Sequence, residues 1–116
     1  RGTTIVMAHF GFPYFLEAAN VMSKNLNVYA DLSGTLDDMG KKEWNRAMMR
    51  AYITDLKRVF AYFPNVMEKV LFGSDFGGDH MSLNLFEPYV KTVRAAFPRS
   101  FHESVFRELA EKIFFS

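Results

Sequence analysis

The sequence predicts an α/β fold in which three parallel strands alternate with helices. Three short runs rich in β-branched and other apolar residues, at 3–8, 28–32 and 70–72, each lead into a loop or turn that contains glycine. Between them, apolar residues recur at spacings of three and four, the pattern of an amphipathic helix. Strands separated in this way by helices pair in parallel through right-handed crossovers.

The first half of the chain shows these elements in order. Residues 3–8 show little alternation, which is typical of a strand buried on both faces of a parallel sheet. A helix is expected from Pro13 to about Lys24, because proline favours the first turn of a helix. After the second strand, the longest helix is expected over about 42–63, where the apolar spacing persists for more than five turns until Pro64 ends it.

The second half repeats the rhythm. The third strand, 70–72, runs into the glycine-rich loop 73–78, and a helix is expected from about 88 to 97. Ser100 and Glu103 have the spacing of a capping box, so they predict the start of a final helix that extends through residue 114. The 116 residues are the size of one small domain, so we treat 1–116 as a single unit.

Composition excludes several classes of protein. With no cysteine, the chain has no disulfide, thiolate metal site or cysteine nucleophile. Fourteen basic and 13 acidic residues leave a formal charge of +1 with no long run of one sign, which argues against nucleic-acid or anionic-membrane partners. No apolar run has the roughly 20 residues of a membrane span. A cytoplasmic protein is the default expectation.

The chain also looks incomplete as a folding unit. It begins at Arg1 and enters a strand within three residues, from which we expect that upstream sequence has been removed. Three parallel strands leave a sheet edge open, and the composition is 49% apolar. We therefore expect a homo-oligomer, or pairing with a missing N-terminal part.

Two residues stand where α/β proteins place their chemistry. His9 and Asp75 follow the first and third strands, at the carboxyl ends that line active sites in barrels and open sheets. The glycines around Asp75 allow a ligand to approach its carboxylate closely. Each residue also has a structural alternative: Asp75 as a helix cap or turn former, and His9 as a strand-end histidine bonded to the backbone.

The segments 6–13 (Val-Met-Ala-His-Phe-Gly-Phe-Pro), 27–34 (Asn-Val-Tyr-Ala-Asp-Leu-Ser-Gly) and 70–76 (Val-Leu-Phe-Gly-Ser-Asp-Phe) together resemble successive strand motifs of the amidohydrolase-related family. This family contains metal-dependent barrel hydrolases and decarboxylases. The resemblance implies a partial (β/α)8 barrel, with strands six to eight and a C-terminal helix, so that 1–116 would be the C-terminal βαβαβα portion of a barrel of about 250 residues.

The resemblance also implies roles for the two site residues. Asp75 would be a metal ligand that takes a proton from the attacking water, and His9 a metal ligand or an acid/base group. The divalent metal would be zinc in the intact parent. The family's first-strand His-x-His pair and fifth-strand histidine are absent here, so we expect this fragment to hold no metal tightly and to be inactive. The stretch 104–109 also departs from the family pattern.

The other histidines have simpler interpretations. His80 lies in the loop after the third strand, where it reaches the cavity mouth or stands in solvent, and His102 is expected to be structural or exposed.

Two functions remain at this point. The first is a metal-dependent hydrolase or decarboxylase that acts on a small, carboxylated substrate. The second is a non-catalytic α/β module that self-associates through its sheet edge and apolar surface.

Overall fold

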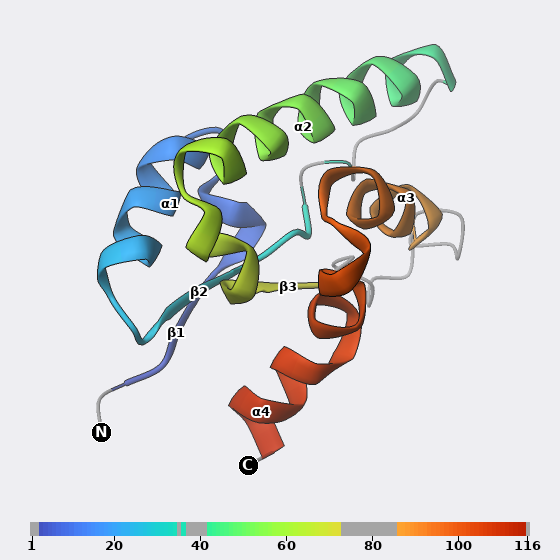
Figure 1. The fold of residues 1–116 in the computed structure, drawn as a ribbon. Coiled ribbons are helices and arrows are strands. Elements are labelled where there is room, and N and C mark those ends of the chain that lie inside the picture. Colours follow the sequence, from blue (N-terminus) through green and yellow to red (C-terminus); the bar gives the residue numbers. More distant parts are fainter. Residues whose placement is uncertain (1–2, 35, 37–41, 73–85, 116) are drawn as a thin grey trace.

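The three predicted strands form one parallel sheet, which confirms the α/β fold (Figure 1). The computed structural model describes residues 3–34, 36, 42–72 and 86–115. The strands are β1 (Ile5–Met7), β2 (Val28–Asp31) and β3 (Val70–Leu71), in the spatial order β1-β2-β3. Met7 pairs with Ala30 and Asp31 with Leu71, so the carboxyl ends of all three strands lie at the same edge of the sheet.

The helices confirm the predicted alternation and differ from the prediction at their ends. In Figure 1, α1 and α2 lie side by side, α3 packs against α2, and the C-terminal helical segment passes the end of β3. Among the described residues, no helix is long and apolar enough to cross a bilayer. The α-helices are α1 (Phe15–Lys24), α2 (Lys42–Tyr62), α3 (Phe86–Ala96) and α4 (Leu109–Phe115).

The core lies on one face of the central strand. Val28 and Ala30 are buried, whereas Tyr29 and Asp31 between them are only half-buried. Because side chains alternate along a strand, the buried pair faces the apolar cluster formed with α1 and α2. The second face of β2 carries the more polar residues.

The prediction that residues 3–8 are buried on both faces is wrong. The strand itself covers only Ile5–Met7, where Ile5 is 46% exposed and the other two residues are half-buried. The physical reason is position: among the described strands, β1 has β2 as its only neighbour and lies at the edge of the sheet. Burial on both faces belongs to central strands.

The predicted capping box is also wrong. Residues 99–101 form a 3-10 turn, closed by a bond from the Phe101 N–H to the Pro98 carbonyl, and no side chain caps it. The Glu103 carboxylate instead pairs with Arg107 one turn further along the helix, at 2.6 Å. Glu103 is therefore engaged within the helix rather than folded back towards Ser100.

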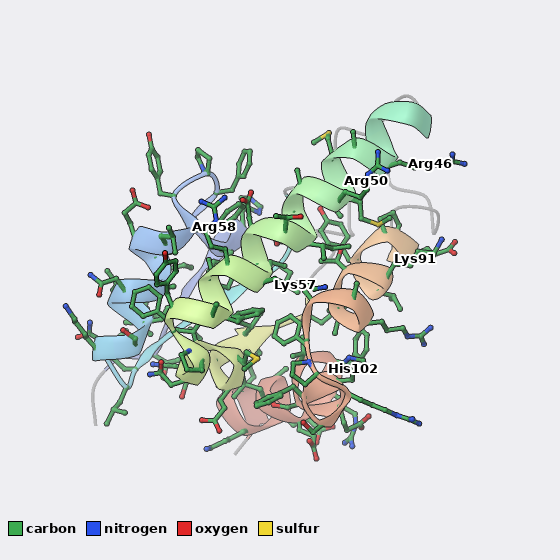
Figure 2. The ribbon with its side chains drawn as sticks, turned by 45° about the horizontal axis from the view of Figure 1, so that its top comes forward. Arg46, Arg50, Lys57, Arg58, Lys91 and His102 are labelled. Atoms are coloured by element: carbon green, nitrogen blue, oxygen red, sulfur yellow. The ribbon has the colours of Figure 1, made fainter. Side chains whose placement is uncertain are left out.

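His102 has the structural role that was expected. Its Nε2 lies 2.9 Å from the Phe97 carbonyl, just beyond the end of α3, and its ring meets Phe106 edge-on. Figure 2 shows this side chain near the end of α3, beside the C-terminal helical segment. His102 therefore ties that segment to α3.

The outer edge of β3 is contacted by the same segment. Residues 104–108 form a widened, π-type turn, and the Val105 carbonyl accepts a hydrogen bond from the Phe72 N–H at 2.8 Å. The rings of Phe72 and Phe106 pack 5.2 Å apart at the same place. The C-terminal helix is thus joined to the sheet by a backbone bond as well as by apolar contact.

Lys69 connects the end of α1 to the start of β3. Its Nζ donates to the carbonyls of Met22 and Asn25, which lie at the C-terminal end of α1, at 2.7 and 2.5 Å, and it lies over the Tyr29 ring. A cation is favourable at a helix C-terminus, where the last carbonyls lack partners. Partial burial lowers the pKa of the amine from its ordinary value by desolvation.

Candidate functional site

His9 directly follows β1, in a backbone conformation that few residues other than glycine adopt. It lies in a 3-10 segment, Ala8–Gly11, with φ 59° and ψ 24°, and Phe10 follows with φ 51°. Such left-handed geometry costs on the order of 1–3 kcal/mol per residue and persists where surrounding contacts enforce it. One contact is the ring of Phe10, which is fully buried and packs edge-on against Phe15 at 6.0 Å.

A second contact comes from the end of the neighbouring strand. The Oδ1 atom of Asp31 accepts three hydrogen bonds: from the His9 N–H at 3.0 Å, the Ser33 N–H at 3.1 Å and the Ser33 hydroxyl at 2.6 Å. The bond to Ser33 N–H is the turn that an aspartate makes with its own backbone two residues on. Asp31 therefore joins the loops that follow β1 and β2.

The His9 ring lies against this turn. Its Nδ1 is 2.7 Å from the Ser33 carbonyl oxygen and 3.2 Å from the Ser33 hydroxyl. A carbonyl oxygen only accepts, so Nδ1 is the donor and carries the proton. In the neutral imidazole, Nε2 then holds the lone pair, and within the described residues no hydrogen bond occupies it. That nitrogen is available as a metal ligand or a base.

Gly34 provides the space for the ring. It has φ +86°, and a Cβ placed on it would lie 1.9 Å from His9 Nδ1 and 2.5 Å from His9 Cγ. Both the backbone angle and the close approach require glycine here. The glycines predicted to open space for a ligand beside Asp75 lie outside the described residues, and Gly34 instead makes space for the His9 ring.

Two buried tyrosines form hydrogen bonds with the backbone on either side of Ser33 and Gly34. The Tyr52 hydroxyl of α2 donates to the Leu32 carbonyl at 3.0 Å, and the Leu36 N–H donates to the Tyr89 hydroxyl of α3 at 2.9 Å. Leu32 is itself fully buried. Hydrogen bonds from α2 and α3 therefore anchor the backbone on both sides of Ser33 and Gly34.

Sequence reasoning named His9 as a candidate site residue, which stays a prediction, and did not name the residues that contact it. Asp31, Ser33 and Gly34 occur in one of the quoted motifs, but we assigned them no role. The signal was present, because Asp31 ends the second strand at the same sheet edge as His9. The alternative for His9 was a histidine that bonds to the backbone at the end of a strand. Nδ1 forms such a bond, with the Ser33 carbonyl, and within the described residues Nε2 does not.

The second predicted site residue, Asp75, lies outside the described residues, as do His80 and the pair Asp37 and Asp38. The part of the chain that the structure describes contains no group of three or more His, Asp or Glu side chains that converges on a metal position. The Oδ1 atom of Asp31 is engaged in three hydrogen bonds to His9 and Ser33. At this site, the described residues offer a metal one nitrogen ligand atom, the Nε2 of His9.

Two hollows between α1 and α2 lie outside this site. They have volumes of about 130 and 330 Å³, share Leu16 and Glu17 in their walls, and include none of the residues around His9. The first is also lined by Asp55 and Arg58, which form an ion pair across one helical turn at 3.6 Å. These hollows belong to the helical exterior rather than to the carboxyl edge of the sheet.

Comparison with protein families identifies a match over nearly the whole chain. The family model described as "Amidohydrolase" matches residues 1–115, nearly the whole chain. Searches of curated proteins and of solved structures gave no match.

Proposed function

The chain belongs to the amidohydrolase family, and from this membership, together with the geometry of His9, we propose that it is the C-terminal third of a metal-dependent barrel hydrolase or decarboxylase. The three strands would be the sixth to eighth of that barrel. The observation that supports this proposal most directly is the orientation of His9, whose Nε2 lone pair stands at the carboxyl edge of a parallel sheet.

His9 and Asp75 carry the proposed chemistry. In the intact protein, His9 Nε2 and the Asp75 carboxylate would hold a divalent metal, with zinc as the expected ion. When bound, this ion activates water or polarises the substrate. Asp75 would accept the proton of the attacking water, and His9 would act as ligand or acid/base group. The substrate class is a small, carboxylated molecule, and the site would be cytoplasmic.

The function is tested on the longer protein that contains this chain. Release of product from a panel of small carboxylated amides and esters, and of CO2 from small carboxylic acids, is measured with metal supplied. His9→Ala and Asp75→Asn are each expected to lower kcat by at least about 100-fold, the usual worth of an acid/base group. His102→Asn is the matched control and is expected to keep the parental kcat, because His102 bonds only within the C-terminal packing. Undiminished kcat in His9→Ala would refute the proposal.

The 1–116 chain alone is expected to bind no metal tightly. A tight zinc site uses three or four protein ligands, and the proposal supplies two. Calorimetric titration of the isolated chain with Zn²⁺ is therefore expected to show no nanomolar site. A nanomolar Kd that Asp75→Ala abolishes would contradict this expectation.

A second candidate, a self-associating module, is favoured by the edge strand. Among the described strands β1 pairs on one side only, and Ile5 on it is 46% exposed. Unpaired strand edges are templates for association. Light scattering of the 1–116 chain is expected to show a homo-oligomer, or pairing when the N-terminal part of the proposed barrel is added. A monomer at high concentration, with no pairing on addition, would rule this out.

We do not propose nucleic acid or membrane as partners, because several cations are paired with acids on their own helices. Arg58 pairs with Asp55, and Lys91 pairs with Glu87 at 3.2 Å. Figure 2 shows Arg58 at the part of α2 nearest α1, far from Lys91 on α3.

A further inference from the structure

We propose that Asp31 is a positioning residue for His9: its carboxylate holds the loops after β1 and β2 together so that the Ser33 carbonyl keeps the proton on Nδ1 and Nε2 is presented with its lone pair. The geometry exists in this chain whatever reaction it serves. Its catalytic importance rests on the proposed function.

The first step of the argument is the convergence on one atom. Oδ1 of Asp31 accepts from the backbone of His9 and from both the backbone and the hydroxyl of Ser33. Bonds to a carboxylate are shorter and stronger than those between neutral groups. Asp31 thereby restrains His9, which carries Nδ1, and Ser33, which bonds to Nδ1. Its own side chain forms no bond with the imidazole.

The second step concerns the backbone of His9. A histidine at φ 59° is held away from the commonly populated regions, so its position depends on the bonds that restrain it. The bond from its N–H to Asp31 is one of these, and it links segments 22 residues apart in sequence. Without it, the loop after β1 loses a restraint at the residue that carries the ring.

The third step concerns the ring. The hydrogen bonds of the two ring nitrogens decide which of them carries the proton in a neutral imidazole. Here the Ser33 carbonyl lies 2.7 Å from Nδ1 and can only accept, so Nδ1 carries the proton. The Ser33 hydroxyl donates to Asp31 and so turns a lone pair towards the same Nδ1–H. Both Ser33 groups favour one tautomer, and Asp31 orients both.

The experiment is nitrogen-15 NMR of the His9 ring in the 1–116 chain, with a chelator present, in a mildly alkaline buffer that keeps the imidazole neutral. Correlations through two bonds identify which ring nitrogen is protonated. The parental chain is expected to show at least about a tenfold preference for Nδ1–H. In Asp31→Ala this preference is expected to fall to about twofold or less.

Three matched variants separate positioning from general loss of structure. Asp31→Asn keeps an acceptor oxygen and is expected to restore most of the Nδ1–H preference. Ser33→Ala keeps the carbonyl and is expected to retain it, and Asp55→Ala, on the surface of α2, is expected to leave it unchanged. An unaltered preference in folded Asp31→Ala, or an Nε2–H tautomer in the parental chain, would overturn the proposal.

The parental chain also tests the inference without any variant, should Asp31→Ala not fold. The His9 amide proton, bonded to Asp31, is expected to exchange with solvent at least about tenfold more slowly than that of the exposed residue Leu26. Equal exchange rates would overturn the proposal. Failure of the proposed function would give a different result. His9→Ala in the longer protein would keep its activity, while the tautomer preference and the slow amide exchange would still be observed.

Discussion

Replacing Leu56 with alanine is expected to lower the free energy of unfolding by about 3 kcal/mol, within the range of about 2–5 kcal/mol typical of such changes. Leu56 lies in α2, is fully buried and belongs to the apolar cluster that also contains Met22 and Val66. The substitution removes three methyl or methylene groups and leaves a cavity between the helices and the sheet. Since small domains are stable by about 5–15 kcal/mol, this loss is a large share of the total.

The measurement is urea unfolding followed by circular dichroism, with the midpoint and the slope fitted together. Leu26→Ala is the matched control, because Leu26 is 93% exposed and the same atoms are removed there without a cavity. Its effect is expected to stay within about 0.5 kcal/mol. Equal losses for the two variants would show that the core is not packed as described.

Replacing Gly34 with alanine is expected to cost about 3 kcal/mol and to displace the His9 ring. The added Cβ would lie 1.9 Å from Nδ1, far inside contact distance, and alanine at φ +86° is strained as well. Left-handed backbone costs a residue with a Cβ roughly 1–2 kcal/mol, and overpacking adds about 1–3 kcal/mol. Because the struck atom, Nδ1, is the one that bonds to the Ser33 carbonyl, displacement of the ring is expected to break that bond.

Gly11→Ala separates the two costs. Gly11 has φ +68°, and its Cβ would meet only the Ala18 Cβ, at 2.9 Å. The backbone strain is similar, but the contact at 2.9 Å is less severe than the one at 1.9 Å and does not involve the His9 ring, so the loss in urea unfolding is expected to be smaller. If Gly11→Ala destabilises as much as Gly34→Ala, the contact between Gly34 and His9 is not the cause. A changed nitrogen-15 spectrum of His9 in Gly34→Ala alone would confirm the displacement.

The parts of the fold that were predictable are those decided by neighbouring residues. The helix expected over about 42–63 is found at Lys42–Tyr62, because its periodicity continues for many turns and Pro64 follows. The parallel order of the strands also follows from the alternation of elements. Both depend on patterns that can be read along the sequence without knowing which segments lie side by side.

The features of the fold that could not be predicted depend on which segments lie next to one another in space. Ile5 is as apolar as a central-strand residue, and its exposure comes from the place of β1 at the edge of the sheet. Glu103 had two available partners, and only the helix geometry selects Arg107. At the candidate site, the position of His9 after a strand is a local feature that the sequence displays, whereas its hydrogen bond to Asp31 joins residues 22 positions apart.

The bond between the Phe72 N–H and the Val105 carbonyl affects where a further strand could join the sheet. Successive backbone groups of a strand point to opposite sides, and the Leu71 carbonyl already accepts from Leu32 in the β2 direction, so Phe72 N–H points outwards. A fourth strand that added beside β3 would have to break this bond and move the C-terminal helix. A strand that added beside β1 would displace no described contact of this kind, so the sheet extends most readily from the β1 side.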